Sequence, residues 1–207
     1  SDTHAHEISQ HQLLNIQVVL ACARALKRRR DFNMPAFIKA IAAYRGLAHR
    51  FELIQSESIQ NQASITWIND SKATNPGASI AAIKALITQK SAIILIAGGD
   101  AKGADLSDWA ALVNNCVTHT FLIGKDAQHI SAMLDSSSIV ADLASAVAQA
   151  KRLLSGESFA HKMPYQQAHV NKVCVLLSPA CASIDMFANY QARGDEFARL
   201  VKQQVAA

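Results

Sequence analysis

The stretch Asn69-Asp70-Ser71-Lys72-Ala73-Thr74-Asn75-Pro76-Gly77 lies between an apolar run at residues 65–68 and an alanine-rich segment at residues 78–86. The apolar run predicts a strand, and the alanine-rich segment predicts a helix that the asparagine and proline before it would cap and start. Helix capping alone leaves Asp70 and Lys72 without a role. Because open α/β sheets bind ligands where their strands end, we interpret the stretch as part of a binding site.

Strands and helices alternate through the part of the chain that surrounds this stretch. Apolar runs predict strands at residues 49–54, 63–68, 92–97, 117–123, near 139 and at 173–177, and helical periodicity predicts helices at residues 76–86, 106–115, 126–134, 142–154 and 196–204. The runs at 93–96 and 173–177 lack polar alternation, as parallel strands covered on both faces do. The sequence therefore predicts an α/β fold with a doubly wound, mostly parallel sheet.

Two helical patterns precede the alternating part. Apolar residues recur at helical spacing over residues 10–27, and Asn33 and Pro35 open a second helix. Two helices alone make a poor domain because they bury too little apolar surface. We therefore expect residues 1–47 to be the end of a larger domain and residues 48–207 to form a domain of their own.

The composition predicts a cytoplasmic protein. The 207 residues are 50% hydrophobic, which is enough for one sizeable core. No apolar run approaches the roughly 20 residues that cross a bilayer, and the polar start of the chain does not fit a signal peptide. We expect His4 and His6 to be terminal residues rather than metal ligands.

Charge and cysteine content exclude two further classes of site. The net charge is +4, and the run Lys27-Arg28-Arg29-Arg30 alone accounts for it. No aromatic residues are interleaved with that run, which favours a solvated helix end over a nucleic-acid patch. The four cysteines show no C-x-x-C spacing, which favours reduced thiols over a zinc site or a disulfide framework.

Three unusual loops follow predicted strands, and parallel strands bring such loops to one edge of a sheet. The first is residues 70–75. The second, residues 98–105, has glycines that let backbone approach a ligand, and its Lys102 offers a point charge. The third, residues 178–183, carries small residues whose exposed amides and hydroxyls suit a carboxylate or phosphate. We therefore predict a site for a small anionic molecule.

Common nucleotide and nucleophile motifs are incomplete. Gly98-Gly99 does not fit G-x-G-x-x-G, and Gly124-Lys125 lacks the earlier glycine and the following Ser or Thr of the Walker pattern. Cys181 invites a nucleophile interpretation, but no partner histidine is indicated. Residues 156–172 are interpreted as a long surface loop, to which we assign no chemistry.

With these residues in view, the chain resembles the C-terminal part of the Mur ligase family. The segments that carry the resemblance are in family order and span almost the whole chain: residues 46–52 (GLAHRFE), 67–75 (WINDSKATN), 98–102 (GGDAK), 177–183 (LSPACAS) and 187–197 (FANYQARGDEF). Among the family's members, residues 70–75 and 178–183 most resemble those that add D-glutamate.

The resemblance implies an ATP-dependent amide-bond ligase of peptidoglycan synthesis, which adds D-glutamate to UDP-N-acetylmuramoyl-L-alanine through an acyl phosphate. Residues 1–47 would be the last helices of a central ATPase domain, and residues 48–207 a complete Rossmann-like, amino-acid-binding domain. The P-loop and most Mg²⁺ contacts would lie upstream, so we expect the chain alone to be inactive. The implied partners are D-glutamate, ATP and the uridine-linked substrate, with no nucleic acid or membrane, and the implied oligomeric state is a monomer.

On the amino-acid side, the resemblance implies that Thr74, Lys102 and Ser183 hold the two carboxylates of D-glutamate. Charge-assisted hydrogen bonds suit that role. Tyr190 stands where Phe is common in the family, a change that keeps an aromatic ring beside the amino-acid pocket.

On the ATP side, the resemblance implies that Arg50 and Lys72 approach the phosphates when the domain closes, with Lys72 as the catalytic residue. Asp70 would accept hydrogen bonds from the ribose hydroxyls, and Asn15 would face the base. The alternative for Arg50 is a surface ion pair with Glu52, and the alternative for Asn15 is an exposed helical amide.

Two departures from the family pattern leave questions open. The family usually has His-Asn where this chain has His11-Gln12, which bears on the adenine contact, and residues 156–172 resemble an insertion.

The alternative functions are those of another Mur ligase, of a folylpolyglutamate synthase, or of a non-catalytic module that binds an acidic amino acid or a nucleotide.

Overall fold

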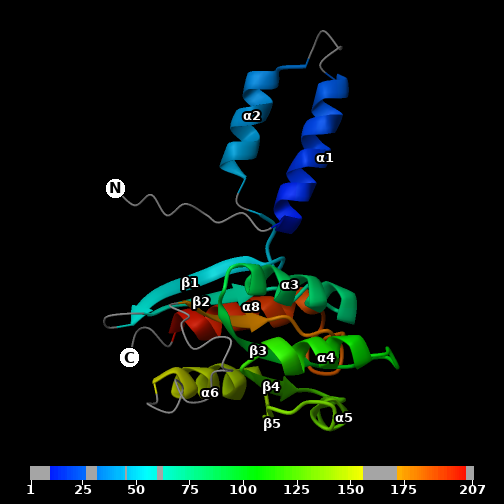
Figure 1. The fold of residues 1–207 in the computed structure, drawn as a ribbon, viewed down its shortest axis with the longest axis vertical. Coiled ribbons are helices and arrows are strands. Elements are labelled where there is room, and N and C mark those ends of the chain that lie inside the picture. The colour runs from blue at the N-terminus through cyan, green and yellow to red at the C-terminus, as the bar shows by residue number, and fades with distance from the viewer. Residues whose placement is uncertain (1–9, 27–31, 45, 60–62, 156–171, 204–207) are drawn as a thin grey trace. The chain divides into compact units, whose positions relative to one another are not determined.

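The computed structural model describes residues 10–26, 32–44, 46–59, 63–155 and 172–203 (Figure 1). They belong to two compact units, Ser1–Gly46 and Leu47–Ala207. The expectations for His4 and His6, for the basic run at 27–30 and for residues 156–171 lie outside the described residues.

The first unit is a pair of helices. α1 spans Gln10–Leu26 and α2 spans Met34–Ala43. The side chain of Asn33 accepts a hydrogen bond from the backbone N–H of Ala36 at 3.0 Å and so caps α2, as the sequence predicts. That this unit ends an ATPase domain stays a prediction.

The second unit is built on one six-stranded sheet. Its strands are β1 (Glu52–Ile59), β2 (Ala63–Asn69), β3 (Ala92–Gly98), β4 (His119–Ile123), β5 (Ser137–Ile139) and β6 (Lys172–Leu177). Their order across the sheet is β1-β2-β6-β3-β4-β5. Only the β1–β2 pairing is antiparallel, and the other four are parallel. The predicted mostly parallel α/β sheet is confirmed.

Helices cover both faces of this sheet. They are α3 (Pro76–Thr88), α4 (Ser107–Cys116), α5 (Ala127–Ser131), α6 (Leu143–Ser155) and α8 (Tyr190–Gln203). One core cluster joins the sheet to α3, α4 and α5, and the other joins it to α6 and α8. No helix among the described residues has the length and apolarity that a membrane span needs.

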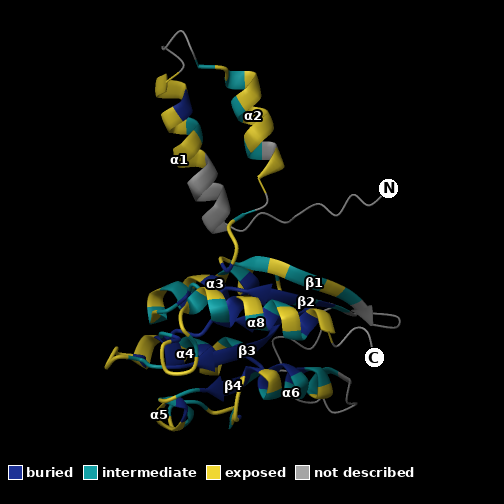
Figure 2. Cartoon of the chain, turned by 180° about the vertical axis from the view of Figure 1, so that it is seen from behind, coloured by how far each residue is buried: buried dark blue, intermediate teal, exposed yellow. Residues whose placement is uncertain are grey.

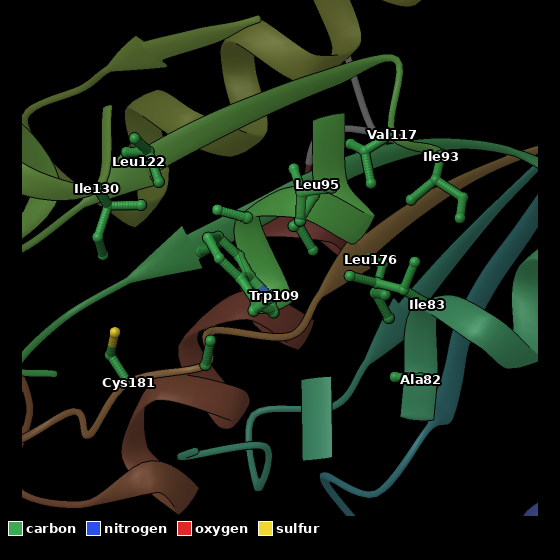
Figure 3. Close-up of a cluster of buried hydrophobic side chains, with 14 of the residues drawn as sticks. Ala82, Ile83, Ile93, Leu95, Trp109, Val117, Leu122, Ile130, Leu176 and Cys181 are labelled. Carbon is green, nitrogen blue, oxygen red and sulfur yellow. The ribbon is translucent and has the colours of Figure 1, made fainter. Parts of the chain in front are cut away.

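Successive residues of β3 point into opposite cores. Leu95 packs in the cluster with Trp109 and Ile83, whose convergence Figure 3 shows. Ile94 packs in the other cluster, with Val147 of α6 among its members. Every residue of β3 is buried (Figure 2), which explains why this strand shows no polar alternation in the sequence.

Several predicted boundaries are wrong, and two of the starts have a local reason. The strand predicted at residues 49–54 also ends too early, because β1 runs to Ile59, and the helix predicted at residues 126–134 ends too late, because α5 stops at Ser131. β1 begins at Glu52 rather than at residue 49, because His49 and Phe51 have positive φ (62° and 49°) and form a turn before the strand. α8 begins at Tyr190 rather than at residue 196. Its first turn is capped by Asn189, whose side chain accepts from the Ala192 N–H at 2.8 Å.

We expect neighbouring residues of β3 to matter equally for stability. Ile94→Ala and Leu95→Ala should each lower the free energy of unfolding by about 2–5 kcal/mol, because each leaves a cavity in a different core. Leu53→Ala on β1, where the side chain is 47% exposed, is the control and should cost less than about 1 kcal/mol. Urea unfolding measures all three. A core variant as mild as the control would contradict the two-sided packing.

Candidate functional site

The strand order brings three loops to one edge of the sheet. β6 lies between β2 and β3, so the loops that leave their carboxyl ends are neighbours. The backbone N–H of Asp70 donates to the Leu177 carbonyl at 2.8 Å, and that of Gly98 donates to the Pro179 carbonyl at 2.9 Å. These bonds continue the sheet pairing into the loops and fix how the loops lie against each other.

The second and third loops are joined directly. Asp100 and Ala182 exchange two backbone hydrogen bonds, of 3.0 and 2.9 Å. Gly99 makes the approach possible, because its φ is +126° and a Cβ there would lie 2.2 Å from the Ala182 carbonyl oxygen. Lys102 and Ser183 follow this junction and are therefore brought to the same place.

A pocket of about 230 Å³ opens beside the junction. Its lining comes from all three loops and the start of α8: Thr74, Lys102, Ala182, Ser183, Ile184, Ala188, Asn189 and Tyr190. The four residues predicted to hold an acidic amino acid, Thr74, Lys102, Ser183 and Tyr190, all line it. It combines the hydroxyls of Thr74, Ser183 and Tyr190, the amide of Asn189 and the Lys102 ammonium with an apolar wall, which is a donor set for a small anion.

The acidic residues near the pocket brace the loops. Asp100 accepts from the Lys102 N–H at 2.9 Å, which holds the pKa of Asp100 below its ordinary value, and forms an ion pair with Lys125 at 3.4 Å. Asp126 accepts from the Ala101 N–H at 2.7 Å. Within the described part of the chain, the Lys102 ammonium forms no ion pair, so its charge is available to the pocket.

Lys72 lies against the ring of Tyr190. Its Nζ is 4.2 Å from the ring centroid, which is cation–π geometry. The His49 ring meets the same tyrosine edge-on, at 6.1 Å between centroids. The backbone N–H of Lys72 also donates to the His49 carbonyl at 3.0 Å. Lys72 is thus placed beside the pocket, although it does not line it.

Arg50 lies in the turn before β1, and Asp70 directly follows β2. Arg50 is exposed, and its charge acts on Asp70. Among the described residues, no ion pair joins Arg50 to Glu52, and the Glu52 carboxylate accepts from the His49 N–H at 2.9 Å. Arg50 is therefore a cation open to a ligand.

Asp70 is nearly buried beneath this turn. One carboxylate oxygen accepts from the Phe51 N–H and the other from the Ser178 hydroxyl, each at 3.1 Å. Burial raises the pKa of Asp70 to about 6 against the lowering effect of these bonds and of Arg50. Its contact with ribose hydroxyls stays a prediction. The expectation of exposed hydroxyls at residues 178–183 is wrong, because Ser178 is fully buried as this donor and Ser183, although it lines the pocket, is 3% exposed.

Asn15 lies in α1, in the other unit, and its side chain is outside the described part of the structure. Cys181 is fully buried, and burial raises the pKa of its thiol to about 12. A thiol that stays protonated at neutral pH is a poor nucleophile, so the catalytic interpretation of Cys181 is not supported.

Arg193 is a site residue that the sequence reasoning missed. The residue is 1% exposed, and its guanidinium donates from Nη2 to the Ser71 carbonyl at 2.9 Å, from Nε to the Ser71 hydroxyl at 3.0 Å, and to the Cys181 carbonyl at 3.3 Å. It therefore ties the loop that carries Lys72 and Thr74 to the loop that carries Ser183. Burial lowers the pKa of Arg193 to about 10, so the group stays charged at neutral pH.

A second buried network holds α8 against the same loop. The Asn69 amide donates to His49 Nδ1 and to the Gly194 carbonyl, both at 3.1 Å, while its oxygen accepts from the Ser71 N–H at 3.1 Å. Gly194 is required there, because a Cβ would lie 2.3 Å from the His49 ring. The sequence carries no local signal for this packing, because neither the burial of Arg193 nor its partners can be read from the neighbouring residues.

The chain matches a family model described as "Mur ligase, glutamate ligase domain" over residues 49–159, just over half of its length. It is 40% identical over 195 residues to the UDP-N-acetylmuramoylalanine–D-glutamate ligase of Colwellia psychrerythraea, covering 93% of this chain and 36% of the relative. It is also 40% identical, over 198 residues, to the ligase of the same name from Saccharophagus degradans, covering 93% of this chain and 38% of the relative. The chain thus spans a little more than a third of the length of these curated relatives.

Solved structures share the fold at low identity. A folylpolyglutamate synthase of Mycobacterium tuberculosis superposes with a TM-score of 0.63 at 16% identity, over 91% of this chain and 40% of that protein. MurF of Acinetobacter baumannii superposes with a TM-score of 0.58 at 16% identity, over 94% of this chain and 38% of that protein.

The raised pKa of Asp70 predicts a pH-dependent stability. The folded chain holds this proton more tightly than the unfolded chain, so the stabilisation is complete below about pH 4 and is lost as the pH rises through about 6. Asp70→Asn keeps an acceptor for the Phe51 N–H without the charge. The free energy of unfolding of the wild type should therefore fall relative to this variant by about 2 kcal/mol between pH 4 and pH 7, because the pKa rises from 3.8 to about 6 on folding.

Asp142→Asn is the matched control for this series of urea unfolding curves. The hydrogen bond from the Ser145 N–H lowers the pKa of Asp142, so the wild type should gain stability relative to that variant as the pH rises. A difference between wild type and Asp70→Asn that does not change with pH would contradict the burial of an ionisable Asp70.

Replacing the buried guanidinium should loosen the loop junction. Arg193→Lys supplies one ammonium in place of the planar fork, leaves a buried carbonyl without a donor, and should lower the free energy of unfolding by about 2–3 kcal/mol. Arg199→Lys on the exposed face of α8 is the control and should change it by less than about 0.5 kcal/mol. Equal effects of the two substitutions would show that Arg193 does not hold the two loops together.

Proposed function

Because the chain belongs to the Mur ligase family, we propose that it supplies the D-glutamate site of an ATP-dependent ligase that joins D-glutamate to UDP-N-acetylmuramoyl-L-alanine. The observation that carries the proposal is the pocket shared by Thr74, Lys102, Ser183 and Tyr190. The names of the relatives at 40% identity support the choice of amino acid and acceptor. The setting would be peptidoglycan synthesis in the cytoplasm.

The pocket suits a molecule with two carboxylates. Lys102 offers a charged donor from one side, and the hydroxyls of Thr74 and Ser183 offer neutral donors from the other two loops. Ile184 and Ala188 give an apolar wall for the methylene groups between the carboxylates. D-glutamate would thus be held at both ends, which orients its amine for attack.

The proposed reaction forms one amide bond in two steps. The carboxylate of the uridine-linked substrate attacks the γ-phosphorus of ATP, so that ADP leaves and an acyl phosphate forms. The amine of D-glutamate then attacks the acyl carbon, loses a proton, and phosphate leaves. Lys72 would neutralise charge that develops on the transferred phosphoryl group, and Arg50 would reach the phosphates from the exposed turn before β1.

We propose that ATP is bound through Asn15, Arg50, Asp70 and Lys72. Within the described residues, no group of three or more His, Cys, Asp and Glu side chains is placed to hold a metal ion. We assign Mg²⁺ to the reaction and propose that most of its contacts lie in the central domain that the family resemblance implies.

The test is D-glutamate-dependent phosphate release from ATP and UDP-N-acetylmuramoyl-L-alanine, measured for the complete gene product and for the 207-residue chain. We expect turnover by the complete gene product and none by the 207 residues, which contain no Walker pattern. Binding of D-glutamate without turnover by the complete gene product would instead favour a non-catalytic binding module. Turnover with another amino acid but not D-glutamate would favour a different ligase of the same fold.

Lys102→Ala should raise the KM for D-glutamate about 10- to 100-fold in the complete gene product, because a charge-assisted contact to a carboxylate is lost. Lys84→Ala, which removes an exposed cation from α3, is the matched control and should leave the KM unchanged. If both variants keep the wild-type KM, the carboxylate assignment is wrong.

A further inference from the structure

The ammonium of Lys72 and the ring of Tyr190 form a contact that the proposed roles of the two residues do not require. Lys72 is assigned to the phosphates and Tyr190 to the amino-acid pocket, yet Lys72 Nζ lies 4.2 Å from the ring centroid. We propose that Tyr190 is a positioning residue for the reaction, whose ring holds the Lys72 ammonium at the edge of the D-glutamate pocket. This inference rests on the proposed function.

The backbone on both sides of the contact is fixed. The Ser71 hydroxyl donates to the Tyr190 carbonyl at 2.8 Å and accepts from Arg193 Nε at 3.0 Å. On the other side, the Lys72 N–H donates to the carbonyl of His49, whose ring packs against Tyr190. The two side chains therefore lie close because their main chains are held together, so the contact costs side-chain entropy but little backbone entropy.

The ring is the group that orients this ammonium. Among the described residues, the salt bridges join His49 to Asp195, Lys125 to Asp100, and Arg199 to Glu196, and none involves Lys72. A lysine ammonium on its four-carbon stem samples many positions unless a partner restricts it. An aromatic face restricts the cation without neutralising it, so the full charge stays available to phosphate or carboxylate oxygens.

The arrangement also connects the two ligands. Tyr190 lines the pocket and contacts Lys72 with the same ring, so a change at the ring reaches both the amino-acid site and the cation assigned to the phosphates. Loss of the ring should therefore impair the chemical step as well as amino-acid binding. A residue that only lined the pocket would affect amino-acid binding alone.

The first test is a double-mutant cycle in the complete gene product, with kcat and the KM for D-glutamate measured separately. Tyr190→Phe keeps the ring and should keep kcat within about 2-fold. Tyr190→Leu should lower kcat about 10-fold in the wild-type background, which is within the range of a partly desolvated cation–π contact. In the Lys72→Met background, Tyr190→Leu should leave kcat unchanged. Equal losses of kcat in both backgrounds would overturn the proposal.

The second test needs no turnover. In the 207-residue chain, the ε-methylene protons of Lys72 should resonate upfield of those of other lysines, because they lie near an aromatic ring. The shift should persist in Tyr190→Phe and disappear in Tyr190→Leu, and Lys72→Arg identifies the resonance. An unshifted wild-type resonance would overturn the contact. An inactive complete gene product whose shift is present would instead count against the proposed function.

Discussion

The position of β6 between β2 and β3 is the constraint on which the rest of the site depends. Three strands that are distant in sequence end side by side, so the loops that follow them meet at one edge of the sheet. The paired hydrogen bonds between Asp100 and Ala182 then join two of these loops directly. Lys102 and Ser183 follow that junction, and Thr74 from the loop after β2 and Tyr190 from the start of α8 complete the lining. Their convergence thus follows from backbone pairing rather than from contacts among the functional groups themselves.

Buried polar groups hold the loops in this arrangement. Arg193 joins two loops through neutral oxygens only, and Asn69 joins α8 to the turn before β1. Such networks are costly to bury unless every member is paired, and they fix one geometry when it is. Asp70 shows the cost most clearly, because its burial opposes its own ionisation while its two acceptors keep Phe51 and Ser178 in place. These buried hydrogen bonds therefore define one arrangement of the loops beneath the pocket.

The sequence predicts most helices and strands of this fold. It also predicts a binding site where the pocket lies, because it identifies the three loops that contribute to the lining. Uniformly apolar runs such as β3 and the Asn-Pro start of α3 have local causes, so they can be recognised without the structure. The strand order has no local signal, and neither has the partner of a buried side chain. The sequence therefore does not show that Arg193 joins two loops, or that Ser178 is a buried donor to Asp70 rather than an exposed hydroxyl. It also predicts too late a start for α8, because Gly194, a poor helix former, interrupts the first turns of that helix.

The most direct test of the central claim is a crystal structure of the complete gene product with D-glutamate bound. The account predicts that the amino acid occupies the pocket at the edge of the sheet, with carboxylate oxygens about 2.7–3.2 Å from Lys102 Nζ and from the hydroxyls of Thr74 and Ser183. D-glutamate bound elsewhere, or bound in this pocket with both carboxylates out of reach of these three groups, would contradict it.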